Sequence, residues 1–136
     1  MKEVKDESQH VFVRIEHWKE KNTTYANWMG ADLSVDEIKE GAMAILEELT
    51  ENQTSFVIND NREITGVWDE VNDWIANEWM PRAIGAGMTK FAHILSSDLF
   101  SQLSAEFMED NSKTVEGDFQ LRTFGNLEEV EKWLTE

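Results

Sequence analysis

The sequence predicts an α/β fold with a mixed, mostly parallel sheet whose first strand is an antiparallel edge. Segments with apolar residues at period 2 alternate regularly along the chain with segments at period 3.6. The expected order is ββαβαβαβα, in which strands separated by helices pair in parallel through crossovers. No linker rich in Pro, Gly or Ser divides the 136 residues, so we expect one domain, residues 9–136, after a flexible segment, residues 1–8.

The first two strands are expected to form a hairpin. Apolar Val11, Val13 and Ile15 occupy every second position, which is typical of a half-buried strand. A polar turn, residues 19–22, separates this run from a second strand-like run, residues 23–29. Because the turn is short, only antiparallel pairing is possible.

A long amphipathic helix follows the hairpin. Ser34 and Glu37 form a capping-box pattern, which predicts the start of the helix. Its apolar face comprises Val35, Ile38, Ala42, Ile45, Leu46 and Leu49. Residues 55–59, which are mostly apolar, then predict a strand covered on both faces.

A second helix is rich in tryptophan. Thr65 and Asp69 suit its first turn, with Thr65 as the N-cap, and Pro81 should end or kink it. Residues 85–87, Gly-Ala-Gly, predict the turn that follows. The apolar residues of the helix are Trp68, Val71, Trp74, Ile75 and Trp79.

The last part of the chain predicts two further strands, residues 90–95 and 119–124, each followed by a helix. Ser97 and Asp98 can cap the first helix, and Asn126 opens a capping box for the second. The inner side of the first helix is expected to carry Leu99, Phe100, Leu103 and Phe107. The terminal helix carries Leu127, Val130, Trp133 and Leu134.

The composition excludes several classes of function. With 12 Lys+Arg against 28 Asp+Glu, the net charge is −16, which argues against binding nucleic acid or anionic lipid. The absence of Cys excludes disulfides, thiolate nucleophiles and cysteine metal sites. The longest apolar run, residues 42–46, is too short to span a membrane, and the first residues lack the apolar stretch of a signal peptide. We therefore expect a cytoplasmic protein.

The order of elements resembles the SpoIIAA-like fold of STAS domains and CRAL-TRIO lipid-binding domains, and in particular the small bacterial proteins described as STAS/SEC14-like. The likeness covers roughly residues 23–135, and several short segments carry it. They are Asn27-Trp28-Met29-Gly30, Asp60-Asn61-Arg62, Trp74-Ile75 with residues 79–83, residues 86–92, and residues 122–129 with Trp133-Leu134. The resemblance implies a fold and carries no defined activity.

One feature departs from the STAS proteins that antagonise anti-sigma factors. Those proteins contain an Asp-Ser pair that acts as a switch. Phosphorylation of its serine breaks the interface with the partner protein. The corresponding residues here, 64–69, contain no such pair, and Thr65 is the nearest hydroxyl. A role for Thr65 as a helix N-cap is the alternative to phosphorylation.

Ligands of parallel α/β sheets gather at the carboxyl ends of the strands. The residues expected there are Asp60, Asn61 and Arg62 after one strand and Ser96, Ser97 and Asp98 after the next. The guanidinium of Arg62 could hold a carboxylate or phosphate group. Alternatively, Asp60 and Arg62 pair with each other, or with Arg82, and fix a loop. His93 could be a hydrogen-bonded core histidine, or a general base working with Ser96 or Ser97 in a hydrolase.

Four tryptophans are candidates either for the core or for the wall of a cavity: Trp28, Trp68, Trp74 and Trp79. A cavity of this kind would suit a lipid or another small apolar or amphipathic ligand. The leading hypothesis is a non-catalytic binding module, without cofactor or metal, for such a ligand or for a protein partner. The alternative is a regulatory interaction domain related to the anti-sigma factor antagonists. A homodimer is possible through the edge strand.

Overall fold

The computed structural model describes residues 1–135 and contains one six-stranded sheet with helices on both faces. The strands are β1 (Lys2–Lys5), β2 (Val11–Trp18), β3 (Thr23–Ala31), β4 (Phe56–Thr65), β5 (Lys90–Ile94) and β6 (Gln120–Phe124). The α-helices are α1 (Val35–Asn52), α2 (Asn72–Trp74), α3 (Met80–Gly85), α4 (Leu99–Ser112) and α5 (Leu127–Leu134). Short 3₁₀ turns, η1 (Lys19–Lys21) and η2 (Asp69–Val71), and a π-helical turn, η3 (Ile75–Trp79), complete the chain.

The six strands are neighbours in the order in which they occur along the chain, from β1 to β6. β1 pairs with β2 and β2 with β3 in antiparallel fashion, whereas β3, β4, β5 and β6 are parallel. The predicted α/β class with a mixed, mostly parallel sheet is therefore confirmed.

The structure differs from the prediction at the N-terminus. Residues 1–8 were expected to be flexible, but β1 pairs with β2, with Val4 opposite Val13. Val4 is buried against the core while its charged neighbours remain outside it. One apolar side chain and a backbone ladder are enough for a strand at a sheet edge. The edge strand is therefore β1, and the strand predicted at residues 11–15 is the second in the sheet.

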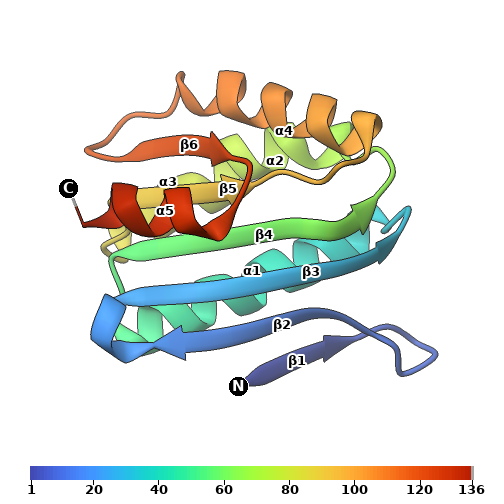
Figure 1. Cartoon of the computed structure of the whole chain (residues 1–136), viewed down its shortest axis with the longest axis horizontal. Helices are drawn as coiled ribbons and strands as arrows, with labels where there is room; N and C mark the ends of the chain where they lie inside the picture. Colours follow the sequence, from blue (N-terminus) through green and yellow to red (C-terminus); the bar gives the residue numbers. More distant parts are fainter. Residues whose placement is uncertain (136) are drawn as a thin grey trace.

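Helices cover the two faces of the sheet unequally. Figure 1 shows α5 in front of the sheet and α1, α2 and α3 behind it. The larger apolar core joins the sheet to α1, the α2–α3 segment and α4. The smaller core lies under α5 and comprises Tyr25, Ile58, Ala92, Ile94, Val130 and Trp133.

β4 is longer than predicted. It continues beyond Asn59 to Thr65, because it stays paired with β3 as far as Ala31 opposite Thr65. Thr65 is therefore a strand residue, and its predicted role as a helix N-cap is wrong. Helical structure begins only at Asp69. Pro81 is the second residue of α3, which continues directly from the π-helical turn, so it does not end the helical segment as predicted.

The predicted orientation of α4 is wrong. Asp98 caps the helix through its side chain, as expected. However, Leu99, Phe100, Leu103 and Phe107 are between 42% and 63% exposed. The buried residues are Ser101, Ser104, Ala105, Met108 and Ser112. Hydrogen bonds of Ser101 and Ser104 with the segment before α2 hold this face inward. None of the helices in residues 1–135 is both long and apolar enough to cross a membrane.

Candidate functional site

A small cavity of about 50 Å³ lies between the sheet and the helices behind it. Its wall is mostly apolar and includes three of the six tryptophans. The residues that matter for its chemistry are Trp28, Asn59, Asn61, Trp68, Trp79 and Met108. Trp28, Trp68 and Trp79 are buried in the larger core and also line this small cavity, so the two alternatives for these tryptophans are not exclusive.

Local structure explains why the indoles gather there. Trp28 packs over α1 at Gly41, where an added Cβ would lie 2.4 Å from the indole ring. Gly41 thus makes room for the ring. Ile75 and Trp79 begin and end the π-helical turn, and both line the cavity. Such turns are rare and often occur at functional sites. The Trp79 indole N–H is anchored by donating to the Ala42 carbonyl at 2.7 Å.

A chain of neutral hydrogen bonds crosses the sheet beside the cavity; we call it the amide network. Trp28 Nε1 donates to Asn59 Oδ1, and Asn59 Nδ2 donates to Asn61 Oδ1 at 3.0 Å. Asn61 Nδ2 then lies 2.9 Å from Nε2 of His93. Because the Asn61 amide nitrogen is a donor, the Nε2 of a neutral His93 accepts, and its proton is carried by Nδ1.

His93 is held in its neutral form. The ring is 1% exposed, and burial lowers the pKa of His93 to about 4. It stacks on Trp68, with the ring centroids 5.7 Å apart. The interpretation of His93 as a hydrogen-bonded core residue is confirmed. Among residues 1–135, however, the Nδ1 of His93 and the Nε1 of Trp68 are buried without a hydrogen-bond partner.

The opposite face of β4 carries an ionic cluster, formed by Tyr25, Asp60 and Arg62. Nη2 of Arg62 lies 2.7 Å from Asp60 Oδ2, and the Tyr25 hydroxyl donates to the same carboxylate oxygen. The predicted pairing of Asp60 with Arg62 is thus confirmed, although it lies on the strand and not in a loop. The carboxylate is buried, whereas the Arg62 side chain is 47% exposed.

The pKa directions in this cluster follow from its contacts. Burial alone would raise the pKa of Asp60, but hydrogen bonds from Arg62 and Tyr25 outweigh it and lower that pKa. Burial, together with the neighbouring carboxylate, raises the pKa of Tyr25. The cluster is therefore ionised as an Asp60–Arg62 pair at neutral pH, with Tyr25 protonated.

The remaining predicted site residues lie elsewhere. Asp60 and Arg62 are separated from the cavity by the sheet, because alternate strand residues point to opposite faces. Trp74 is half-buried outside the cavity wall, with Lys39 Nζ 5.4 Å from its ring centroid. Ser96 Oγ donates to the Ile64 carbonyl and accepts from the Asp98 backbone, so it fixes the loop before α4.

The sequence placed Asn61 at the carboxyl end of its strand but did not single out Asn59, and it predicted no contact of either amide with His93. Their signal is the alternation of polar residues at the end of a strongly apolar strand. A parallel register that pairs Asn59 with His93 brings the amides and the imidazole together. This register was not predictable from either strand separately.

The catalytic alternative gains no support from these contacts. His93 interacts with Asn61, while the Ser96 hydroxyl is used by backbone groups. Within residues 1–135, no group of three or more His, Asp or Glu side chains is arranged to hold a metal ion. Comparisons of the chain with family models, with curated proteins and with solved structures find no match.

Proposed function

We propose that this protein is a non-catalytic binding module whose cavity takes a small, largely apolar molecule with one hydrogen-bond acceptor. One observation carries the proposal: the buried indole N–H of Trp68, in the wall of an apolar cavity, has no partner within residues 1–135. A buried donor without an acceptor costs roughly 1–3 kcal/mol. A ligand carbonyl or carboxylate oxygen that accepts this hydrogen bond recovers that energy on binding.

The volume limits the size of the ligand. A water needs roughly 10–15 Å³ of this kind of space, and a cavity that binds benzene measures about 150 Å³. The cavity here, about 50 Å³, accommodates only a few non-hydrogen atoms in this conformation. A lipid chain, which the resemblance to CRAL-TRIO domains favours, requires the helices to move apart. The π-helical turn, Ile75–Trp79, is the proposed point of adjustment because its hydrogen bonding is irregular.

Titration followed by ¹H–¹⁵N NMR tests the proposal, because each of the six tryptophans contributes one indole N–H signal. The probes are acetamide, isobutyramide and laurate. We expect acetamide, the smallest of the three, to shift the Trp68 signal saturably, because the cavity of about 50 Å³ accommodates only a few non-hydrogen atoms. A Trp68→Phe variant should bind about fivefold more weakly or worse, because one buried hydrogen bond is lost.

The matched control is Trp74→Phe, which alters an indole outside the cavity wall and should leave the affinity unchanged. If no probe shifts the Trp28, Trp68 or Trp79 signals, or if the Trp68→Phe variant binds as well as the parent, the ligand proposal is wrong. A response to laurate together with large shifts across η3 would instead identify a lipid site that opens.

The second candidate function is a regulatory interaction domain with SpoIIAA-like architecture. The observation that favours it is the apolar outer face of α4, treated below. Phosphorylation at Thr65 would act differently here from the Asp-Ser switch, since Thr65 ends a strand and precedes the helical segment by several residues. Loss of partner binding in a Thr65→Glu variant, with Thr65→Ala unaffected, would support such a switch.

A further inference from the structure

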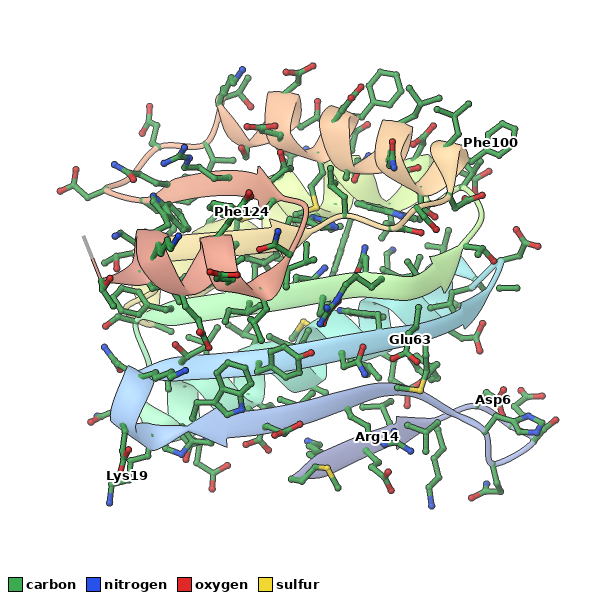
Figure 2. The ribbon with its side chains drawn as sticks, viewed as in Figure 1. Asp6, Arg14, Lys19, Glu63, Phe100 and Phe124 are labelled. Atoms are coloured by element: carbon green, nitrogen blue, oxygen red, sulfur yellow. The ribbon has the colours of Figure 1, made fainter. Side chains whose placement is uncertain are left out.

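The outer face of α4 carries an exposed apolar stripe, which we call the α4 surface. Its four residues are Leu99, Phe100, Leu103 and Phe107, with exposed fractions of 63%, 58%, 42% and 54%. Figure 2 shows Phe100 directed away from the body of the protein. The other exposed large apolar side chains in residues 1–135 are Met1, at 83%, and Val67, at 52%, in the loop bonded to α4. Exposed apolar area is therefore concentrated on α4 and the loop beside it. Such a concentration is typical of an interaction site.

Hydrogen bonds on the inner face hold α4 in this orientation. Ser101 Oγ donates to the Gly66 carbonyl, and Ser104 Oγ accepts from the Trp68 backbone and donates to Asp69. Asn72 also donates to the Ser104 carbonyl. Turning the apolar residues inward would break these bonds and bury unpaired hydroxyls. The outward stripe is thus a stable property of the fold.

The stripe has the shape of a helix-docking surface. Leu99, Leu103 and Phe107 are four residues apart and form one ridge, with Phe100 beside it. At 1.5 Å per residue the ridge is about 12 Å long, which matches two turns of a partner helix. Recognition of an amphipathic helix uses anchors at this spacing.

Charge selects among the possible occupants. Glu106 and Asp110 follow Leu103 and Phe107 by three residues and therefore flank the stripe on the helix surface. Asp110 is partly neutralised by Lys113, whose Nζ lies 3.5 Å from Oδ1, so Glu106 contributes most on this side. On the other side, Asp69 is bonded to Ser104. With a net charge of −16, a second copy would bring these carboxylates against their own kind, and an anionic membrane would be repelled. The complementary occupant is a cationic one.

We propose that the α4 surface binds an amphipathic helix of a partner protein whose apolar face is flanked by Lys or Arg. The apolar stripe supplies the anchors, and the carboxylates select for basic flanks. This inference deepens the interaction-domain candidate and does not depend on the cavity, because the two sites lie on opposite sides of α4. Failure of the ligand titration leaves it unaffected.

The test uses the full chain and a synthetic 14-residue peptide of the repeat Leu-Lys-Lys-Leu-Leu-Lys-Leu. A peptide of the same composition in scrambled, non-amphipathic order is the peptide control. Binding is followed by ¹H–¹⁵N NMR at low and high salt. We expect saturable shifts confined to α4 and the loop at Val67, stronger for the amphipathic peptide and weakened by salt.

Two variants separate the apolar and ionic contributions. Phe100→Ser/Phe107→Ser should weaken binding about tenfold or more, because a few central aromatic anchors supply most of the binding energy of such interfaces. The thermal midpoint should not fall, since both rings are exposed. Glu106→Gln/Asp110→Asn should weaken binding about threefold and reduce its salt dependence. The matched control, Glu40→Gln/Glu51→Gln on α1, changes the charge equally and should leave binding unchanged.

Any of four results overturns the proposal. The scrambled peptide could bind as tightly as the amphipathic one, or the double serine variant could bind as tightly as the parent. Light scattering could show a dimer that the double serine variant dissociates, which would make a second copy the occupant. Vesicles of anionic phospholipid could bind through α4, which would make the partner a membrane.

Discussion

β4 carries two buried polar networks, one on each face of the sheet, and they differ in charge. Asn59 and Asn61 point to the face covered by α1 and the α2–α3 segment and join the amide network. Asp60 and Arg62 point to the opposite face and form the ionic cluster. Four consecutive residues thus supply two networks with no shared member. The amide network carries no charge at neutral pH, whereas the cluster depends on charge.

The difference follows from access to solvent. Helices cover the amide network, and burying an unpaired charge there would cost far more than burying paired amides. In the ionic cluster the carboxylate is buried, but the Arg62 side chain reaches water. Arg62 therefore keeps part of its hydration while it pairs with Asp60. The exposure of one partner decides whether an ion pair is tolerated on a face.

The largest expected effect comes from breaking the amide network at its centre. Asn61→Leu leaves Asn59 Nδ2 and His93 Nε2 without partners. We expect the free energy of unfolding to fall by about 3 kcal/mol, as measured by urea denaturation. The control is Asn27→Leu, whose amide donates to the exposed Glu63 (Figure 2). It should cost under about 1 kcal/mol, and an equal loss in the two variants would contradict the distinction between the faces.

The amide network should also respond to acid before the ionic cluster does. The pKa of His93 is about 4 in the folded chain, against about 6.5 for an ordinary histidine. Its contribution is fully present above about pH 6.5 and is lost as the pH falls towards 4, by up to about 3 kcal/mol. Urea denaturation at pH 7, 6, 5 and 4 measures this slope. In His93→Gln, which keeps an acceptor for Asn61, the slope should flatten; an unchanged slope would refute the assignment.

The ionic cluster should respond at lower pH. Asp60→Asn removes the ion pair with little change of shape, and we expect a loss of about 2 kcal/mol at pH 7, reduced from the fully buried value because Arg62 is half exposed. The folded pKa of Asp60 is lowered, so its contribution is present above about pH 4 and is lost below it. The difference between parent and variant should therefore persist at pH 5 and shrink at pH 3. A difference that disappears by pH 6 would exclude the ion pair as its source.

The smallest effect concerns packing under the amide network. In Gly41→Ala the new Cβ meets the Trp28 ring at 2.4 Å, so the indole must shift. We expect a net loss of about 1–2 kcal/mol, since the strain exceeds the gain in helix propensity. The control, Gly85→Ala near the end of α3, meets nothing within 4 Å and should be neutral or slightly stabilising. Thermal unfolding of the two variants decides between these outcomes.

Local signals in the sequence predicted the starts of two helices correctly. The capping box of Ser34 and Glu37 starts α1 as predicted, and Asn126 caps α5. Capping depends on residues three positions apart, so the chain carries it wherever the helix packs. The inner face of α1 was also predicted correctly, with Ile38, Ala42, Ile45 and Leu49 buried.

The same reasoning failed for α4, which shows its limit. When one face of a helix is apolar and the other is polar, the buried face is the one whose polar groups find hydrogen-bond partners on the neighbouring segments. Around α4 those neighbours are the Gly66 carbonyl, the Trp68 N–H and the Asp69 carboxylate, which suit serines. Residues 99–107 contain no information about these groups, because they belong to a segment more than 30 residues earlier.

From residue 11 onward, the order of strands and helices and the class of the sheet were therefore determined by local pattern, because period, caps and turns act within a few residues. The strand register, the orientation of α4 and the size of the cavity were decided only by the tertiary structure. Each of them depends on which distant groups face one another across the core. The unpaired N–H of Trp68 belongs to the second kind, since a donor is unsatisfied only in relation to every group packed around it.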